Sequence, residues 1–520
     1  MTCNRQTRLP VVLASRVLIS ALVATLAHPG ARAEPSYAKD GAFGSDTVPE
    51  LARALSRSPF VPPKTPLPAV LANLTYDQYR DIRSPPSSAI WAQKGTFFRL
   101  QVLPRGFLFT DAVEIALVVG GVAQHVAYRS DLFTTGTVMK SPLPTEDIGF
   151  SGFRILYPIN RPVVFDEAGV FQGASYFRSL GAHQAYGLAA RGLANKTAEP
   201  EGEEFPAFRA FWIEEPLHTS QTLVVHALLD SPGVAGAYRF RIHPGHSTTM
   251  DVEVVLFPRT ELAKVGLAPS TSMFMFSPNG RLAIDDFRPE VHDSDGLLVI
   301  NGRGEHIWRP LENPGQVQVS AFLDKNPRGF GLLQRNRNSA DYQDFEAHYE
   351  RRPSLWIEPV GDWGEGSVML TEIPSEAEIH DNIVAFWRPK APVAANSEFR
   401  CSYRLVWGDG PKDGQDRARV MATRRGRADV RAPTHVRRFV IDYSAAVGSA
   451  HTRAKLPQAA VSASAGEIRD VVVSENPLLE GYRVSFVFDP KQAEVAELRV
   501  DLDFRDGRLG ETWVYRWTTP

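Results

Sequence analysis

The sequence predicts an all-β protein built from sandwiches of strands. Helical periodicity is scarce, whereas short runs rich in β-branched and aromatic residues recur along the chain. Clusters of Gly, Pro, Asn and Asp bound these runs and favour turns between strands. Clear examples are LVVHALL (223–229), YRFRIHP (238–244), DVEVVLF (251–257) and QVQVSAFL (316–323). Helices are expected only locally, at 51–56 and 76–82, with a helical turn around 342–349.

The strand runs divide into two groups around a Pro/Ala-rich segment. RPKAPVAANSE (388–398) has no hydrophobic pattern, and it predicts a linker at 391–396. Beyond it, about seven strand runs in about 120 residues are typical of an immunoglobulin-like sandwich. We therefore expect a large β-sandwich over 34–390 and a small immunoglobulin-like β-sandwich over 397–520, with FRCSYRLVW (399–407) as the first strand of the small domain.

The first 33 residues have the pattern of a secretory signal peptide. Arg5 and Arg8 precede an uncharged apolar run at 17–27, and Ala31-Arg32-Ala33 supplies a small-x-small cleavage motif. The apolar run is too short for a comfortable membrane span, and no later segment is long and apolar enough for one. The sequence therefore predicts export to the periplasm and cleavage after residue 33.

The net charge limits the classes of partner, and the cysteine content limits how the folded chain can be stabilised. Residues 1–33 contain four arginines and no acids, so 53 of the 57 basic residues remain against 59 acidic ones, a balance of −6. An acidic balance argues against nucleic acid or an anionic membrane as partner, and is compatible with a neutral, hydroxyl-rich sugar. Only Cys3 and Cys401 occur, so the mature chain cannot form an internal disulfide and must depend on a large core.

The stretch RPEVHDSDGL (288–297) concentrates Glu290, His292, Asp293 and Asp295 in a single run. It lacks the four ligands of a structural zinc site and the spacing of an EF-hand loop, so we expect no metal and no cofactor. Asp295 followed by Gly296 favours a tight turn. A catalytic role is compatible with that turn, because catalytic residues often lie on loops held between strands.

Other chemical motifs are weak. GASYF (173–177) does not match the nucleophile elbow of serine hydrolases, and Gly302 and Gly304 form only an isolated G-x-G. Paired carboxylates remain: Asp293 in one phrase, and Glu378 with Asp381 in AEIHDNIVAFW (377–387). Asp381 precedes an apolar run, so it either caps the start of a strand or is an acid held in a cleft.

Aromatic and basic residues are interleaved in the same half of the chain. Each ring could be a core residue, but together they make a carbohydrate groove plausible, since rings can stack on sugars while arginines and acids bond hydroxyls. The aromatic residues are Trp308, Tyr349, Trp356, Trp363 and Trp387, and the arginines are Arg309, Arg335, Arg337, Arg351 and Arg352.

Many phrases in order give the chain a family resemblance. YDQYRDIR (76–83), GFSGFRILYPIN (149–160), GASYFR (173–178), RPEVHDSDGL, YERRPSLWIEP (349–359) and DNIVAFW (381–387) resemble the OpgG/OpgD (MdoG) family of periplasmic glucans biosynthesis proteins. The resemblance implies a large mutarotase-like β-sandwich followed by an immunoglobulin-like domain. It also implies a role in making osmoregulated periplasmic glucans, β-1,2-linked glucose chains with β-1,6 branches.

Two functions are compatible with this resemblance. One is an inverting endo-β-1,2-glucanase that trims or remodels the glucan backbone. The other is a non-catalytic glucan-binding factor that assists β-1,6 branching or release of the nascent glucan. The expected partner is β-1,2-linked glucan, with the membrane glucan synthase as a further candidate contact and no nucleic acid.

The match to the family phrases gives each site residue an expected role. Asp381 is expected to be the general acid and Asp293 the base, presented by the Asp295-Gly296 turn and roughly 6.5–9.5 Å from the acid in an inverting enzyme. Tyr349 and Arg352 are three residues apart, so on a helical turn they share a face toward substrate. Further expected substrate-binding residues are Glu378, Trp308, Trp356 and Trp387.

Overall fold

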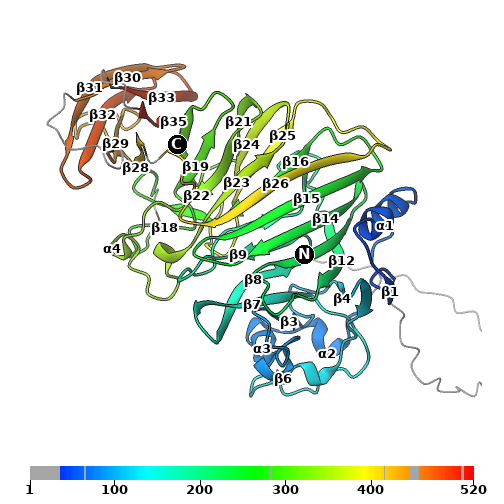
Figure 1. Ribbon diagram of the computed structural model, residues 1–520. Coiled ribbons are helices and arrows are strands. Elements are labelled where there is room, and N and C mark those ends of the chain that lie inside the picture. Colours follow the sequence, from blue (N-terminus) through cyan, green and yellow to red (C-terminus); the bar gives the residue numbers. More distant parts are fainter. Residues whose placement is uncertain are drawn as a thin grey trace, which may run out of the picture. The chain divides into compact units, whose positions relative to one another are not determined.

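Two large sheets packed face to face form the main body of the chain (Figure 1). The structure is a computed structural model that describes residues 36–519, with gaps at 64–65, 282–283, 415, 446–455 and 505–508. The predicted signal peptide, 1–33, lies outside the described residues. Strands dominate and the helices are short, so the predicted all-β sandwich class is confirmed.

The first sheet contains fifteen strands, of which only the pairs β4–β12 and β20–β35 are parallel. Its strands in spatial order are β1 (Gly41–Ala42), β5 (Val122–His125), β4 (Glu114–Val119), β12 (Ala207–Glu214), β13 (Leu223–Asp230), β14 (Val234–His243), β15 (Thr248–Pro258), β26 (Phe399–Gly408), β23 (Ser354–Val360), β22 (Gly329–Leu333), β19 (Gly296–Ile300), β20 (His306–Pro310), β35 (Thr512–Thr518), β33 (Val495–Asp503) and β30 (Gln458–Ala463).

The second sheet is entirely antiparallel and contains ten strands. In spatial order they are β21 (Gln318–Lys325), β24 (Glu365–Glu372), β25 (Ile383–Pro389), β16 (Val265–Ser272), β10 (Ala189–Arg191), β9 (Tyr176–Ser179), β8 (Val164–Gln172), β7 (Gly152–Arg161) and β3 (Arg99–Leu103), with β11 (Ala194–Asn195) pairing beside β10 on β16.

Phenylalanine rings join the facing sides of the two sheets. In the second sheet, Phe153 pairs with Phe171, and Phe171 pairs with Phe177, on three successive strands. All three are fully buried. Their rings meet Phe211 and Phe240 of the first sheet at centroid distances of 5.1–5.6 Å, mostly edge to face. Because side chains alternate along a strand, their neighbours in sequence point away from this core.

A smaller sandwich of seven strands follows near the C-terminal end. The strands β30, β33 and β35 face a four-stranded sheet, and Phe439 of that sheet meets Trp513 of β35 at a ring distance of 5.8 Å. Its own core includes Trp308 and Trp356 from the first large sheet, so the two cores share a wall. The four strands are β28 (Val420–Arg427), β29 (Arg437–Tyr443), β32 (Gly481–Asp489) and β31 (Glu467–Asn476).

The strand at 399–408 corrects one sequence-based expectation. It was expected to begin the small domain, but β26 lies inside the first large sheet, between β15 and β23 (yellow in Figure 1). Tyr403, Leu405 and Trp407 of this strand belong to the main core. The Pro/Ala-rich segment therefore leads the chain back into the large sheet. The division of the chain into two domains at 391–396 stays a prediction.

Short helices and two-stranded pairs complete the described part of the chain. Helix α1 covers the first sheet by packing Val48 and Ala52 against Trp212, and α2 and α3 lie beside β3 (Figure 1). None of the described helices has the length and apolar character needed to cross a bilayer. The helices are α1 (Thr47–Ser56), α2 (Ala69–Ala72), α3 (Tyr76–Asp81), η1 (Pro86–Ser88), η2 (Ser130–Leu132), α4 (Ser339–Tyr342) and η3 (Tyr349–Arg351), and the paired strands are β2 (Ile82–Arg83) with β6 (Thr134–Thr135), β17 (Phe274–Phe276) with β18 (Val291–His292), and β27 (Arg417–Ala418) with β34 (Leu509–Gly510).

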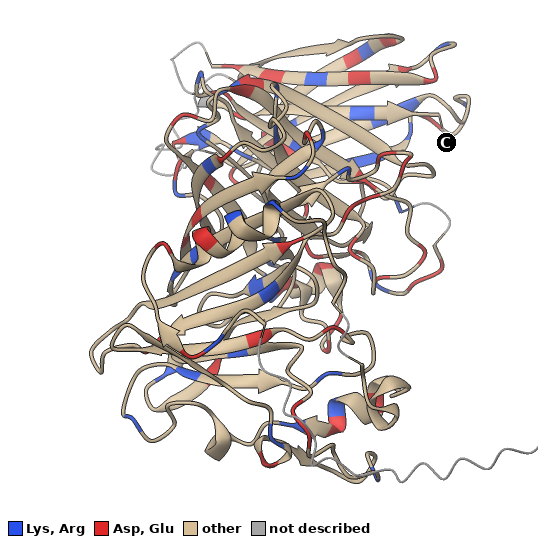
Figure 2. Ribbon diagram, turned by 90° about the vertical axis from the view of Figure 1, so that its right-hand side faces the viewer, with Lys and Arg blue, Asp and Glu red and all other residues tan. Residues whose placement is uncertain are grey.

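Charged residues of both signs are interspersed along the strands (Figure 2). Neither sign dominates the strands seen in that view, in line with the near balance of the composition.

Candidate functional site

A cavity of about 1110 Å³ lies on the side of the second sheet that faces away from the phenylalanine core. Its walls come from α3, from the neighbouring strands β3, β7, β8 and β9, and from the loops around residues 273, 293, 352 and 378–381. Four residues that the sequence singled out lie in this one wall: Asp293, Arg352, Glu378 and Asp381. Residues from three distant phrases of the sequence thus line one cavity, and their roles in binding and catalysis stay predictions.

Strand alternation places a polar row on the floor of the cavity. Arg154, Gln172 and Arg178 each follow one of the buried phenylalanines directly in sequence, so they point out of the opposite face of β7, β8 and β9. All three line the cavity. Sequence reasoning gave them no role, although the repeated Phe-Arg pairs in GFSGFR and GASYFR were a usable signal.

Asp293 is the most buried carboxylate of the cavity, with 3% of its surface exposed. Its backbone N–H donates to the carbonyl of Met273 at 2.8 Å, which fixes the segment after β18. Its carboxylate forms an ion pair with the guanidinium of Arg352. Burial raises the pKa of Asp293, the positive charge of Arg352 opposes that rise, and the negative charge of Asp381 adds to it.

Asp381 lies two residues before β25, at the strand start that the sequence predicted. Its Oδ2 atom accepts a hydrogen bond of 3.1 Å from the hydroxyl of Thr271, and the Arg178 guanidinium lies 3.8 Å away. About a quarter of the side chain is exposed, at 24%. Asp381 is therefore anchored on one side and open toward the cavity on the other.

Glu378 joins the cavity wall to the segment that precedes β23. The hydroxyl of Tyr349 donates to its Oε2 atom at 3.0 Å, and Nη1 of Arg288 lies 2.9 Å from the same oxygen. Tyr349 begins the 3-10 turn η3, as the predicted helical turn required, and Arg352 folds back over its ring. Tyr349 is 2% exposed and lies behind the cavity wall, where it holds Glu378 in place. Burial raises the pKa of its hydroxyl.

The three tryptophans expected to bind substrate are core residues, which corrects that part of the prediction. Trp356 and Trp387 are 3% and 0% exposed, and neither lines the cavity. Trp308 is 3% exposed and borders a different cavity, beside the small sandwich. Each indole covers a glycine of a neighbouring strand so closely that no side chain would fit there, namely Gly296 for Trp308, Gly329 for Trp356 and Gly366 for Trp387.

The expected Asp295-Gly296 turn is also corrected. Gly296 is the first residue of β19 and pairs with Pro310 and Leu333 in the ladder. The carboxylate of Asp295 instead accepts from the backbone N–H groups of Arg335 and Asn336. Asp295 thus caps the backbone of the neighbouring segment at 335–336. Asp293 lies in the link between β18 and β19.

An aromatic and apolar rim was missed by sequence reasoning. Tyr76, Leu108 and Ile379 line the cavity with 56%, 76% and 82% of their surfaces exposed. Tyr79 packs beside them, with ring distances of 6.2 Å to Phe107 and 5.7 Å to Phe109. Exposed apolar surface at a cavity mouth marks a place where a ligand with apolar faces can dock. The signal was the phrase YDQYRDIR, which carries the first two tyrosines.

Comparison with known proteins decides the family. Residues 43–517 match the family model described as "Periplasmic glucan biosynthesis protein, MdoG". The chain belongs to this family. Members named glucans biosynthesis protein G include one from Vibrio cholerae serotype O1, 59% identical over 93% of this chain and 88% of the relative. One from Shewanella frigidimarina is 58% identical over 93% of this chain and 86% of the relative. The MdoG family membership gives the protein a role in periplasmic glucan biosynthesis.

Solved structures resemble the chain only distantly. A polysaccharide lyase is 9% identical, covers 64% of this chain and 39% of its own, and has a TM-score of 0.16. A protein from Synechocystis is 8% identical with a TM-score of 0.14, over 61% of this chain and 94% of its own. Likeness at this level carries no argument about function.

Proposed function

We propose that this MdoG family member is an inverting endo-β-1,2-glucanase that trims or remodels the backbone of periplasmic glucan. The observation that carries the proposal is the meeting of Asp381 and Asp293 in one cavity of about 1110 Å³. A pocket of this size is large enough for several sugar units, and glycoside hydrolysis by inversion uses two carboxyl groups in different roles.

Asp381 is assigned as the general acid. It lies in the cavity wall, where a glycosidic oxygen can approach, and its only short hydrogen bond among the described residues comes from the neutral hydroxyl of Thr271. In the reaction its proton passes to the departing glycosidic oxygen while the bond from that oxygen to the anomeric carbon breaks. Glu378, held by Tyr349 and Arg288, shapes the wall beside it.

Asp293 is assigned to the base side of the reaction. Inversion requires a water on the far face of the sugar, whose oxygen bonds to the anomeric carbon as its proton moves to a carboxylate. Arg352 pairs with Asp293 and supplies the positive charge that favours its ionised form against the cost of burial. The guanidinium groups of Arg154 and Arg178 in the polar row supply donors for sugar hydroxyls.

A non-catalytic glucan-binding factor is the second candidate, and one observation favours it. Both carboxylates have a guanidinium partner, Arg352 for Asp293 and Arg178 at 3.8 Å for Asp381. A carboxylate can accept a hydrogen bond from a sugar hydroxyl while the paired guanidinium donates one. Such binding requires no proton transfer. Such a factor would hold the growing glucan for β-1,6 branching or release.

Incubation of the purified protein with linear β-1,2-glucan separates the two functions. The glucanase yields shorter oligosaccharides whose new reducing ends have the inverted anomeric configuration in an NMR time course. Binding measured by calorimetry without any shortening of the glucan would establish the binding factor and overturn the glucanase. The Asp381→Asn variant is the control against a contaminating enzyme, since product must disappear with it.

We also propose that the chain is exported to the periplasm after cleavage at residue 33. The charged start, the apolar run at 17–27 and the Ala31-Arg32-Ala33 motif support this, as does membership of a periplasmic family. The specific β-1,2 linkage and a contact with the membrane glucan synthase stay predictions of the family resemblance.

A further inference from the structure

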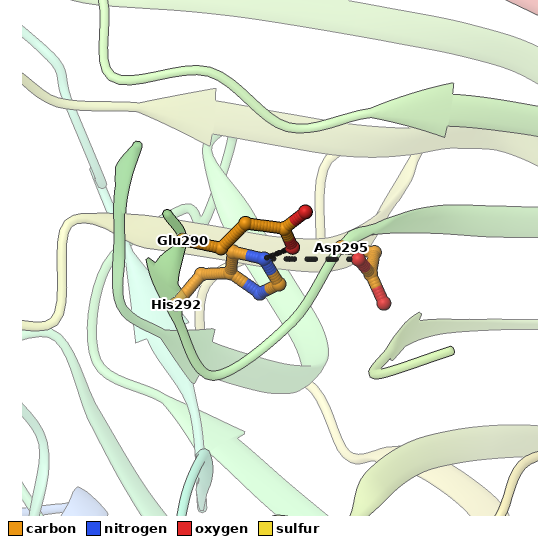
Figure 3. Close-up of side chains that lie close together, drawn as sticks. All are labelled: Glu290, His292 and Asp295. Atoms are coloured by element: carbon orange, nitrogen blue, oxygen red, sulfur yellow. Dashed lines mark hydrogen bonds and ion pairs between the residues drawn. The ribbon is translucent and has the colours of Figure 1, made fainter. Parts of the chain in front are cut away.

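Glu290, His292 and Asp295 converge on one point outside the cavity described above (Figure 3). Nε2 of His292 lies 3.0 Å from Oε2 of Glu290 and 3.8 Å from Oδ1 of Asp295. The three potential ligand atoms all lie within 4.8 Å of one another. His292 is completely buried, with its ring stacked on Phe274 at 5.4 Å.

Gln334 fixes which ring nitrogen of His292 carries a hydrogen. The amide nitrogen of Gln334 donates to the carbonyls of His292 and Tyr349 at 3.0 and 3.1 Å, so its oxygen must face Nδ1 of the ring, 3.0 Å away. Nδ1 is therefore the donor in the neutral ring, and the lone pair of Nε2 points at the two carboxylates. With the ring neutral, three acceptors face one another there, and either a proton on Nε2 or a bound metal ion between them would stabilise the arrangement.

Positive side chains do not supply that cation. Within the described ranges, neither Glu290 nor Asp295 has a side-chain nitrogen of lysine or arginine within 4.0 Å, and their only ion-pair partner is His292. The nearby guanidinium of Arg335 is turned away, with both terminal nitrogens 2.7 Å from Glu511. Two carboxylates carry a charge of −2, which a single proton on His292 would neutralise only by half.

We propose that a divalent cation of the zinc class binds at Glu290, His292 and Asp295. One imidazole and two carboxylates without a thiol are ligands that zinc accepts at 2.0–2.2 Å. Ligand atoms at that distance from a tetrahedral ion are separated by about 3.4 Å. The separations of 3.0 and 3.8 Å at Nε2 bracket this value, so the ion fits with small side-chain movements.

The groups around the three ligands have the arrangement of outer partners at a metal site. Gln334 accepts from the imidazole, Asn336 donates to Oε2 of Glu290 at 3.2 Å, and the N–H of Asn336 donates to Oδ2 of Asp295 at 2.9 Å. Oδ1 of Asp295 is left for the ion. Glu290 and Asp295 also line a separate cavity of about 500 Å³, which gives the ion an entrance and a water as fourth ligand.

This site does not rest on the proposed glucanase activity. It joins the β18–β19 segment to the segment 334–336, so the bound ion stabilises that contact in the folded chain. The sequence predicted no metal because three residues in one run are an incomplete ligand set. Gln334, which is distant in sequence, contacts the ring and orients Nε2 of His292 toward the two carboxylates.

Zinc binding to the tag-free full-length protein tests the proposal. After dialysis against a chelator, calorimetric titration with zinc chloride should show one ion per chain, and the thermal midpoint should rise with zinc concentration by mass action. His292→Gln, Glu290→Gln and Asp295→Asn should each weaken binding at least tenfold. The matched control is His226→Gln, because His226 is also buried but lies 2.7 Å from the single carboxylate of Glu214. It should bind zinc like the parent.

Two results would overturn the proposal. One is a parent protein that takes up no zinc; ¹⁵N NMR that shows both nitrogens of His292 protonated at neutral pH would then identify the cation as a proton. The other is equal zinc binding in the parent and the three ligand variants, all folded by circular dichroism. If a variant fails to fold, cobalt titration of the parent decides instead: visible d–d bands of a four-coordinate site with nitrogen and oxygen ligands support the site, and their absence refutes it.

Discussion

The guanidinium of Arg352 lies over the ring of Tyr349, with its Cζ atom 4.2 Å from the ring centroid, while it pairs with the buried carboxylate of Asp293. Tyr349 in turn donates to Glu378. One helical turn thus positions two of the carboxylates that line the cavity, one through the arginine and one through the tyrosine.

Arg352→Ala should lower turnover of β-1,2-glucan by about 10–100-fold, since a charge-assisted hydrogen bond contributes roughly 1.5–3 kcal/mol. Tyr349→Phe keeps the ring beneath Arg352 and loses only the bond to Glu378, so its effect should be smaller. Steady-state kinetics measures both. Arg404→Ala, which removes a partner of Asp251 on the exposed side of β26, is the control and should match the parent. Parental kinetics in both site variants would leave the turn with a structural role only.

Asp381→Asn and Asp293→Asn should each reduce hydrolysis by about 10²–10⁴-fold, because loss of a general acid or base typically has that effect. Asparagine preserves shape, so each variant should stay folded and bind the glucan with similar affinity in calorimetry. Asp251→Asn is the matched control away from the cavity. Cleavage at the parental rate by both site variants would refute the assignment of the carboxylate pair.

Trp387→Phe should destabilise the fold without changing glucan affinity, because the indole is fully buried against Gly366. Removing a buried aromatic ring entirely costs about 3–5 kcal/mol, and the smaller ring should cost less than that. Chemical denaturation and calorimetry measure the two quantities separately. A large loss of affinity in folded protein would restore the tryptophan to the binding site.

Glu372→Gln should change how stability depends on pH. Glu372 is fully buried beside Arg309, and burial raises its pKa from 4.5 to about 7. The folded parent therefore holds a proton that the unfolded chain releases, and its stability falls as pH rises from about 4.5 to 7, by up to about 3 kcal/mol. The glutamine variant lacks this term, so its stability relative to the parent should increase across that range.

Urea denaturation at several pH values measures this difference. Glu365→Gln is the control, since Lys390 lowers the pKa of Glu365 and any effect of its titration lies below that window. A constant difference between the Glu372→Gln variant and its parent from pH 4.5 to 7 would contradict the prediction.

Export should leave a mature chain that begins at Glu34. Mass spectrometry of the protein from a periplasmic extract measures the N-terminus directly. Lysine substitution at Val23, in the middle of the apolar run at 17–27, should retain the longer precursor inside the cell, whereas Lys at the exposed position Val163 should not. A periplasmic chain that still carries Met1 would refute cleavage.

The sequence was sufficient for features that depend on local pattern. The strand run at 223–229, the helical segments expected at 51–56 and 76–82 and the strand start after Asp381 follow from neighbouring residues alone, although the first helix begins at Thr47, four residues earlier than expected. The carboxylates were candidates because acids beside apolar runs are conspicuous in the sequence, and their expected roles came from the match to the family phrases. The phenylalanines of β7–β9 could have shown the polar row behind them, by the same alternation.

Features that depend on distant residues were not predictable in this way. A tryptophan among charged residues has the same local sequence pattern whether it lines a groove or, like Trp387, packs over a glycine of the next strand. The Asp295-Gly296 pair resembles a turn, but the ladder with Pro310 and Leu333 makes Gly296 part of a strand. The pairing of β26 depends on partners about 50 and 150 residues earlier in the chain, which no local pattern reveals.

If the chain is exported as proposed, the insertion of β26 between β15 and β23 determines the order in which its large sheet can be completed. Until residue 408 has crossed the membrane, β15 and β23 each present a free row of backbone donors and acceptors. The large sheet must wait for a strand that follows the Pro/Ala-rich segment, and β20 waits longer still for β35 at 512–518. A chain that stalled during the proposed translocation would therefore expose unpaired strand edges, so completion of the large sheet requires nearly the whole sequence.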